Sequence, residues 1–235
     1  MLETIQSFFL RNLVPVFFVY GLSFLIMFAA IVTWGRESAR FGLMRSFTFL
    51  AGFGLLHGLT EWTDMVRLLV MSPKPLVVGL AVLKLGLLVG SFQSLLYFAF
   101  EVLTSARSEE RRRWQVYISP LLVIAYAAII YYALKDIGLG ELAARYALGF
   151  TGAGLACLAF ANLSHKFSLI GLEQPRRHAL FVAFAFGVYA IFAGLMFVPS
   201  GQPVLVLGVP VQIFRAACAI LIAFFVARLL IFFRR

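Results

Sequence analysis

Charged residues are scarce in this sequence. Only 13% of its 235 residues are Asp, Glu, Lys or Arg, whereas 63% are hydrophobic, including 26 Phe. A soluble domain of this length needs a polar surface, and these residues are too few to form one. Lipid accepts apolar side chains on the outside of a protein, so the composition predicts an integral membrane protein.

Cysteine and histidine are rarer still. Cys157 and Cys218 fall in apolar stretches, where free thiols are expected rather than a disulfide or a metal-binding pair. A metallohydrolase would have to use His57, Glu61 and Asp64, the only candidate ligands at one depth. We find no phosphate-binding glycine loop, nucleophile elbow or kinase signature, and the last apolar stretch lacks the Lys of a retinal protein. We therefore assign no catalytic residue and no metal.

The formal net charge is +10. A nucleic-acid-binding protein concentrates Lys and Arg on one water-exposed face of a folded domain. Here these residues occupy short segments between apolar stretches, where they fit membrane orientation and contact with anionic headgroups better. We therefore expect the lipid bilayer as a partner and no nucleic acid.

Apolar stretches of membrane-spanning length recur along the whole chain. A helix that crosses a ~30 Å hydrocarbon core needs about 20 apolar residues. No segment between the stretches is long enough for a soluble domain, and the first stretch lacks the flanks of a removable signal peptide. The sequence predicts one all-α domain over residues 1–235, a bundle of seven transmembrane helices at 13–34, 46–71, 76–100, 116–134, 146–163, 179–199 and 211–233.

The distribution of Lys and Arg predicts the orientation of this bundle. With the N-terminus outside and the C-terminus in the cytoplasm, 13 of the 20 basic residues fall in cytoplasmic segments and 6 in outer ones. Lys84 remains, at membrane depth. This bias follows the rule that cytoplasmic loops of membrane proteins are enriched in positive charge.

The second stretch carries the most informative polar residues. His57, Glu61 and Asp64 are spaced at i, i+4 and i+7, which places them on one face of a helix. Ionisable groups at membrane depth normally face the bundle interior, pair with one another and mark a functional site. The alternative is that Glu61 and Asp64 have already reached the outer interface, where Trp62 would be an ordinary aromatic-belt residue.

Lys84 favours the first interpretation. Segment 72–75, Ser-Pro-Lys-Pro, predicts a tight turn, and Glu61 and Lys84 lie at similar distances from its centre. We therefore expect them to form a buried ion pair. Arg215 and Arg145 are expected near the same depth, although Arg215 would alternatively extend to the outer headgroups. The predicted ligand-binding cluster comprises His57, Glu61, Trp62, Asp64, Lys84 and Arg215.

Two N-terminal segments carry a family resemblance. Residues 17–24, Phe-Phe-Val-Tyr-Gly-Leu-Ser-Phe, and 53–64, Phe-Gly-Leu-Leu-His-Gly-Leu-Thr-Glu-Trp-Thr-Asp, flank a basic loop. This pattern resembles the membrane sensor regions of bacterial histidine kinases and diguanylate cyclases. The resemblance covers about the first 70 residues; beyond them it rests on the helix count and on the cytoplasmic end Phe-Phe-Arg-Arg at 232–235.

The resemblance implies a multi-pass protein of the bacterial inner membrane that acts in signal transduction. Its last helix would pass a lipophilic or periplasmic cue to a cytoplasmic output domain, and we also expect a homodimer. The chain itself carries no output domain, so it is either an excised input module or a free-standing relative. The sequence requires no cofactor, and a quinone or a lipid is a candidate ligand.

Three other functions use the same residues differently. A small transporter or proton-coupled carrier would use the ionisable residues as a relay, but the sequence shows no inverted repeat or paired broken helices. A quinone-binding or other membrane enzyme is the next alternative. A purely structural subunit of a membrane assembly is the last.

Overall fold

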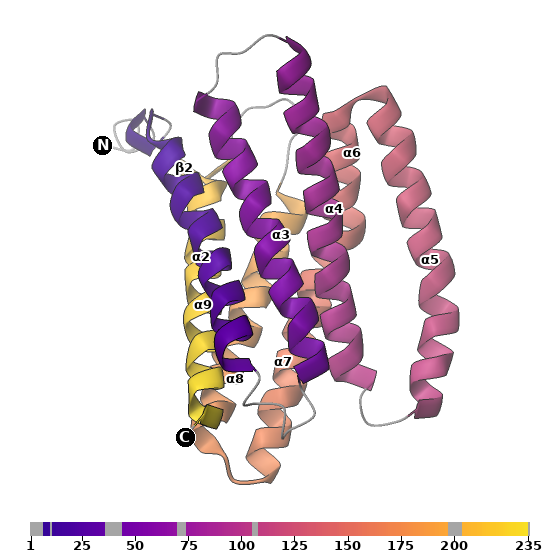
Figure 1. The fold of residues 1–235 in the computed structure, drawn as a ribbon, viewed down its shortest axis with the longest axis vertical. Coiled ribbons are helices and arrows are strands. Elements are labelled where there is room, and N and C mark those ends of the chain that lie inside the picture. Colours follow the sequence, from indigo (N-terminus) through magenta and orange to yellow (C-terminus); the bar gives the residue numbers. More distant parts are fainter. Residues whose placement is uncertain are drawn as a thin grey trace.

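The computed structural model describes residues 7–9, 11–35, 44–69, 74–104, 108–196 and 204–234. Long helices dominate it, because the polar backbone of a segment in lipid must satisfy its hydrogen bonds within that segment (Figure 1). The helices are α2 (Leu13–Trp34), α3 (Met44–Leu69), α4 (Lys74–Thr104), α5 (Ser108–Lys135), α6 (Ile137–Ala144), α7 (Thr151–Leu169), α8 (Glu173–Tyr189) and α9 (Val211–Arg234). Two π-helical turns are continuous with these helices. The first, η2 (Arg145–Phe150), joins α6 to α7 in one helical rod, and the second, η3 (Ala190–Leu195), follows α8 and ends the rod that begins with it.

A short hairpin precedes α9. Its strands, β1 (Leu205–Val206) and β2 (Val209–Pro210), pair antiparallel. Leu207 and Gly208 between them both have positive φ, 53° and 79°. This hairpin delivers the chain to the first residue of α9, whose backbone N–H donates to the carbonyl of Val204.

The predicted all-α class is confirmed. Each predicted span corresponds to a helical segment, and the first has the predicted bounds of 13–34. Residues 70–71 of the second span, 197–199 of the sixth and 72–73 of the predicted turn lie outside the described residues. The fifth helical rod begins at residue 137, nine residues before the predicted 146, because α6 and η2 precede α7.

Among the described residues, five helical segments have the length and composition to cross a membrane: 13–34, 76–104, 137–169, 173–195 and 211–234. They make the chain a multi-pass membrane protein. Helix α3 is outside this group because polar and charged residues interrupt its apolar run, and the apolar part of α5 is short, covering 119–135. Length and hydropathy therefore support five spans in this part of the chain, fewer than the seven predicted.

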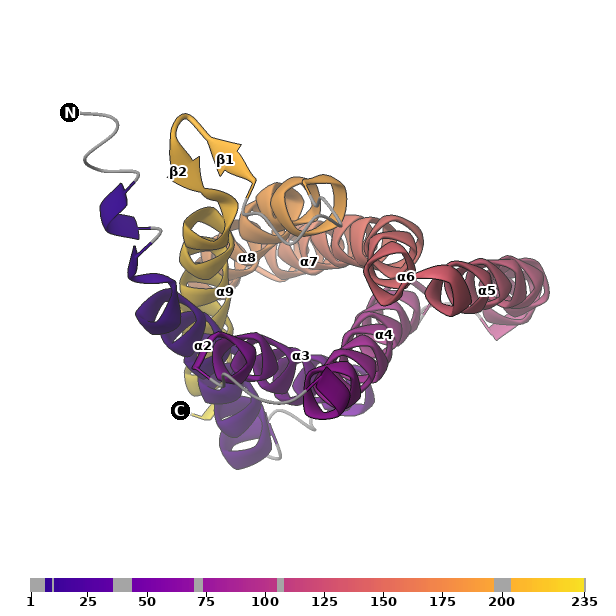
Figure 2. The same cartoon turned by 90° about the horizontal axis from the view of Figure 1, so that it is seen from above.

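In the described part of the chain, six helical rods contact one another in sequence around a closed ring, which is visible when the bundle is viewed along its axis (Figure 2). Going around it, α2 contacts α3, α3 contacts α4, α4 contacts α7, α7 contacts α8, α8 contacts α9, and α9 returns to α2. Helix α5 stands outside this ring and packs mainly on α6. The end of the ring at which α3 ends and α4 begins, at the top of Figure 1, is called the upper end below.

Glycines bring α2 and α3 into close contact. A Cβ atom on Gly58 would lie 2.9 Å from the carbonyl oxygen of Gly21, and one on Gly54 would lie 2.8 Å from that of Phe24. Real Cβ atoms do not approach backbone oxygens so closely, so larger residues would push the helices apart. Small residues serve this purpose in membrane helix pairs, which lack a hydrophobic driving force between them.

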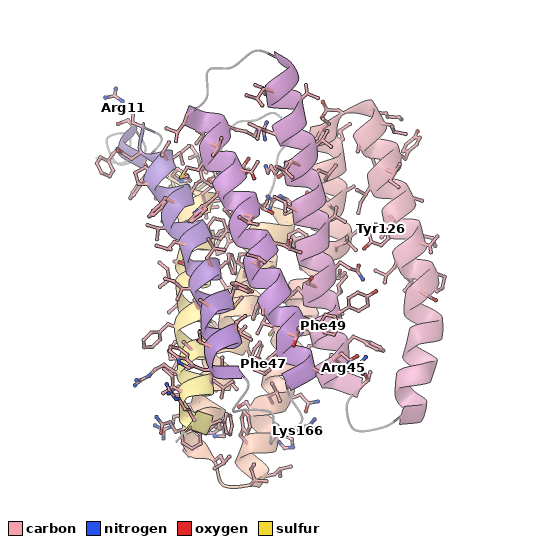
Figure 3. All side chains as sticks on the ribbon, in the orientation of Figure 1. Arg11, Arg45, Phe47, Phe49, Tyr126 and Lys166 are labelled. Carbon is pink, nitrogen blue, oxygen red and sulfur yellow. The ribbon has the colours of Figure 1, made fainter. Side chains whose placement is uncertain are left out.

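Phenyl rings fill the lower half of the ring. Phe160 lies at its centre, with ring centroids 5.1 Å from Phe98, 5.8 Å from Phe186 and 6.4 Å from Phe47. All four side chains are buried. Figure 3 shows Phe47 near the lower end, where Arg45 and Lys166 also lie. Outside this cluster, both cysteines are free thiols, as predicted.

Candidate ligand-binding cavity

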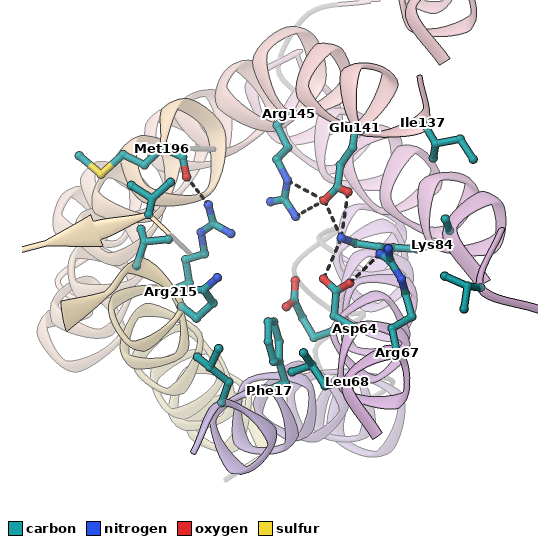
Figure 4. Close-up of a pocket in the computed structure, with 18 of the residues that line it drawn as sticks. Phe17, Asp64, Arg67, Leu68, Lys84, Ile137, Glu141, Arg145, Met196 and Arg215 are labelled. Atoms are coloured by element: carbon teal, nitrogen blue, oxygen red, sulfur yellow. Dashed lines mark hydrogen bonds and ion pairs between the residues drawn. The ribbon is translucent and has the colours of Figure 1, made fainter. Parts of the chain in front are cut away.

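A cavity of about 500 Å³ occupies the upper half of the ring (Figure 4). It reaches the upper end of the bundle, because its lining includes Leu13, Ile137 and Val211, the first residues of α2, α6 and α9. Eight of the nineteen lining residues are charged, four acidic and four basic: Glu61, Asp64, Asp136, Glu141, Arg67, Lys84, Arg145 and Arg215. A cavity with this lining is suited to a polar ligand.

Lys84 is the centre of an ion-pair network on one side of the cavity. Its Nζ lies 2.8 Å from Oδ2 of Asp64 and 2.8 Å from Oε1 of Glu141. Arg145 donates to the same Oε1 through Nε at 3.2 Å and Nη2 at 3.0 Å. The Arg67 guanidinium lies 3.4 Å from Asp64 and belongs to the rim. These side chains tie α3, α4, α6 and η2 together by charge.

The predicted Glu61–Lys84 ion pair does not form. Lys84 instead contacts Asp64, about one helical turn nearer the upper end than Glu61. Side chains lean toward the N-terminus of their own helix, and α3 and α4 run in opposite directions. The Lys84 stem therefore extends toward the upper end, whereas the Glu61 side chain leans away from it. Equal depth of the two Cα atoms did not mean equal depth of the charges.

Glu61 and Arg215 both line the cavity but belong to no ion-pair network. The Glu61 side chain is 2% exposed, and its Oε1 lacks a hydrogen-bond partner. Arg215 donates through Nε to the carbonyl of Phe192 at 2.8 Å and through Nη2 to that of Met196 at 2.6 Å. Among the described residues, no carboxylate pairs with Arg215. Both groups therefore keep bonding capacity that the protein itself does not use.

The π-helical turn η3 explains how Arg215 is held. A π turn shifts backbone hydrogen bonds away from the α-helical pattern and is frequent at functional sites. Carbonyls of and next to η3 accept from both arginines, since Arg145 Nη1 donates to Ala193 at 3.2 Å while Arg215 contacts Phe192 and Met196. Two guanidinium groups from different helical segments therefore both point into the cavity (Figure 4).

His57 lies beneath the cavity in a chain of buried hydrogen bonds. Its Nδ1 is 3.0 Å from Oγ of Ser91, which donates to the carbonyl of Leu88 at 2.7 Å. Its Nε2 is 2.6 Å from the hydroxyl of Tyr189, which is 2.7 Å from that of Tyr20. Because the Ser91 proton goes to Leu88, we assign the His57 proton to Nδ1, so Nε2 accepts from Tyr189.

The structure brings together most of the predicted cluster. Asp64, Lys84, Glu61 and Arg215 line the cavity, and His57 lies directly behind them, with Nε2 3.4 Å from Glu61 Oε1. Trp62 is elsewhere: its ring stacks on Phe18 of α2 at 6.0 Å, and its Nε1 donates to the Phe18 carbonyl. It helps to join α2 and α3 and is not part of the cavity lining.

Sequence reasoning missed Glu141. Segment 137–145 was interpreted as a connection between spans, although Glu141 and Arg145 have the i, i+4 spacing of a helical ion pair. Tyr20 and Tyr189 were also missed, because each is a single polar group within an apolar stretch. Within the described ranges, no three His, Cys, Asp or Glu side chains are grouped as around a metal ion.

Comparisons with protein-family models, curated proteins and solved structures give no match for this chain. The argument for its function therefore rests on the geometry of the cavity and of the helices around it.

Proposed function

We propose that the protein is a membrane-embedded signal-input module, in which a ligand in the cavity alters the position of α9. The observation that carries this proposal is the placement of Arg215. It lines the cavity near the start of α9, and the same helix continues unbroken to Arg234 at the lower end. At 1.5 Å per residue, its 24 residues span about 36 Å. One rigid element thus connects the cavity with the opposite end of the bundle.

For α9 to act as a lever that transmits the signal, it must have two positions, and the ligand must bind more tightly to one of them than to the other. In this structure, the Arg215 guanidinium is held by backbone carbonyls at η3. A ligand anion that pairs with the unused N–H groups of Arg215 draws the guanidinium away from those carbonyls, because charge-assisted hydrogen bonds are the stronger ones. Ligand binding therefore shifts α9 relative to η3, and an output domain attached to α9 receives the movement.

The lining of the cavity favours a water-soluble cue from the outer side. A quinone or a lipid is mostly apolar, and it would leave the unused bonding capacity of Glu61 and Arg215 without a partner. The periplasmic alternative of the sequence-based hypothesis therefore agrees better with the cavity than the lipophilic one.

A proton-coupled carrier is the second candidate function. The observation in its favour is the hydrogen-bond chain from Tyr20 through Tyr189 and His57 to Ser91, behind the Glu61 carboxyl. The chain ends at the Leu88 carbonyl, however, and the phenyl cluster around Phe160 fills the ring below it. Sensing requires no path through that cluster, so it is the better-supported function.

We also propose the seven-span orientation, with the upper end outside and the lower end in the cytoplasm of a bacterial inner-membrane protein. Figure 3 shows Arg45 and Lys166 at the lower end. Reporter fusions after Ser105 and Gln174 should read cytoplasmic, and fusions after Pro73 and Gly201 should read external. A cytoplasmic signal after Pro73 would overturn the model, because α3 would then not cross the membrane.

The test of the lever is a fusion after Arg235 to a diguanylate cyclase reporter. Because Arg215 and Glu61 line the cavity, Arg215→Gln and Glu61→Gln should each change cyclase output. Arg228→Gln is the matched control, since Arg228 lies on the same helix away from the cavity and packs over Phe224. If both cavity variants give the output of the control, the signal-input function is wrong. If Glu61→Gln alone acts, coupling through Arg215 is wrong.

A further inference from the structure

We propose that the cavity binds a small zwitterion of the α-amino-acid type, with its carboxylate at Arg215 and its protonated amine at Glu61. This inference rests on the proposed function only in taking the cavity as the ligand site. It follows from asking which of the lining groups are already satisfied within the protein and which still need a partner.

Most of the charges in the cavity are satisfied by one another. Lys84 lies between Asp64 and Glu141, and Arg145 donates twice to Glu141. The Asp136 side chain accepts from the backbone N–H of Leu139 and caps α6. A ligand gains little from these groups, because it would have to displace bonds that already exist.

Three lining residues retain unused bonding capacity. Glu61 Oε1 and Gln212 Oε1 are buried acceptors without a hydrogen-bond partner. The Arg215 guanidinium has five N–H donors, and its recorded bonds go to two backbone carbonyls. No ion pair joins Glu61 to Arg215 in the part of the chain that the structure describes, although both line the same space. The lining residues thus include one cationic group with unused donors and, separately, two side chains with an unsatisfied acceptor oxygen.

Only a ligand with both charges satisfies both sides. A simple anion would pair with Arg215 but leave the buried Glu61 carboxyl unpaired, and a simple amine would leave Arg215 unpaired. A buried polar group without a partner costs free energy. The anion and the amine each leave one such group unpaired, whereas the zwitterion pairs both. The volume of about 500 Å³ lies within the usual range for small-molecule sites.

The binding experiment uses the full chain, purified in detergent. Thermal unfolding is measured with each of the twenty proteinogenic amino acids, and the one with the largest stabilisation is titrated by calorimetry. Two analogues are titrated beside it: the carboxylic acid that lacks the amine, and the amine that lacks the carboxyl. We expect each analogue to bind about tenfold more weakly or worse, the usual effect of losing one charge-assisted bond.

Two variants assign the charges to their partners. Arg215→Gln should weaken the amino acid and the carboxylic acid but not the amine, whereas Glu61→Gln should weaken the amino acid and the amine but not the acid. Arg228→Gln and Glu101→Gln are matched controls outside the cavity lining. If a cavity variant does not fold, the analogue series on the unmodified chain still decides. The proposal is overturned if no amino acid stabilises the chain, or if the carboxylic acid alone binds as tightly.

The outcome also separates the ligand class from the signalling role. If no amino acid binds but Arg215→Gln and Glu61→Gln change the output of the cyclase fusion, the zwitterion is wrong and the input function stands. If an amino acid binds as described but neither variant changes the output, the ligand class stands and the input function is wrong.

Discussion

The upper and lower halves of the ring solve different problems with the same helices. The upper half buries ions, among them Lys84 between two carboxylates, and keeps a cavity of about 500 Å³. The lower half is filled by interlocked phenyl rings around Phe160. Burying ions in a membrane costs free energy, so buried ions usually mark a functional site. Close packing of apolar side chains stabilises the bundle and does not by itself indicate a function. The buried ions and the cavity are thus separated from the close-packed phenyl rings along the bundle axis.

The largest expected effect comes from removing the central charge of the upper half. Lys84→Met leaves Asp64 and Glu141 facing each other without their shared cation, which should lower the free energy of unfolding by about 3–5 kcal/mol. Thermal unfolding in detergent measures the loss. Lys135→Met is the control, because Lys135 is exposed and lies over the Tyr131 ring.

A second substitution tests the cause of that loss. Adding Asp64→Asn to Lys84→Met removes one of the two repelling carboxylates and should recover part of the stability. An unchanged unfolding temperature for Lys84→Met would show that the network does not stabilise the upper half, and the contrast between the halves would have to be abandoned.

An intermediate effect is expected in the lower half. Phe160→Ala removes the ring that joins Phe98, Phe186 and Phe47. Such changes cost about 3–5 kcal/mol in water-soluble proteins, but lipid is as apolar as the core, so mainly the packing contribution remains, about 2–3 kcal/mol. Leu158→Ala, at an exposed position of the same helix, should cost almost nothing. A large change in ligand affinity for Phe160→Ala would contradict the separation of the two halves.

The smallest effect should occur at the boundary between the halves. Tyr189→Phe keeps the buried ring but removes the hydroxyl between Tyr20 and His57. The Tyr20 hydroxyl is already 3.5 Å from His57 Nε2 and can replace the lost donor after a small movement. We expect a loss of about 1 kcal/mol, the net contribution of a typical hydrogen bond, in the same unfolding assay. A loss as large as that of Lys84→Met would place the boundary within the polar network.

The helices were predictable because length and hydropathy are local properties of the sequence. The first span, 13–34, was predicted to the residue, and each other predicted span overlaps a helical segment over most of its length. The pairing of charges was not predictable in the same way. Whether Lys84 meets Glu61 or Asp64 depends on the direction in which its side chain leans, and that direction follows from how α3 and α4 are paired.

Contacts between distant segments explain the rest of the difference. Arg215 could be placed at the cavity because its depth follows from its position near the start of the last span. The partners of His57 could not, since Tyr20 and Tyr189 lie 37 and 132 residues away on other helices. Glu141 was missed because the helical residues 137–145 fall between the predicted spans 116–134 and 146–163.

The π turn η2 also determines which way its rod faces above and below it. Successive residues of an α-helix are rotated by about 100°, so an unbroken helix would place Glu141 and Phe160, 19 residues apart, about 100° out of phase. The π turn accommodates one extra residue and removes a rotation of about that size. Glu141 can therefore face the cavity while Phe160 faces the phenyl cluster, both toward the ring interior. Deleting a single residue within 145–150 would leave Glu141 and Phe160 18 residues apart on a regular helix, which is five full turns, so both side chains would still face the ring interior.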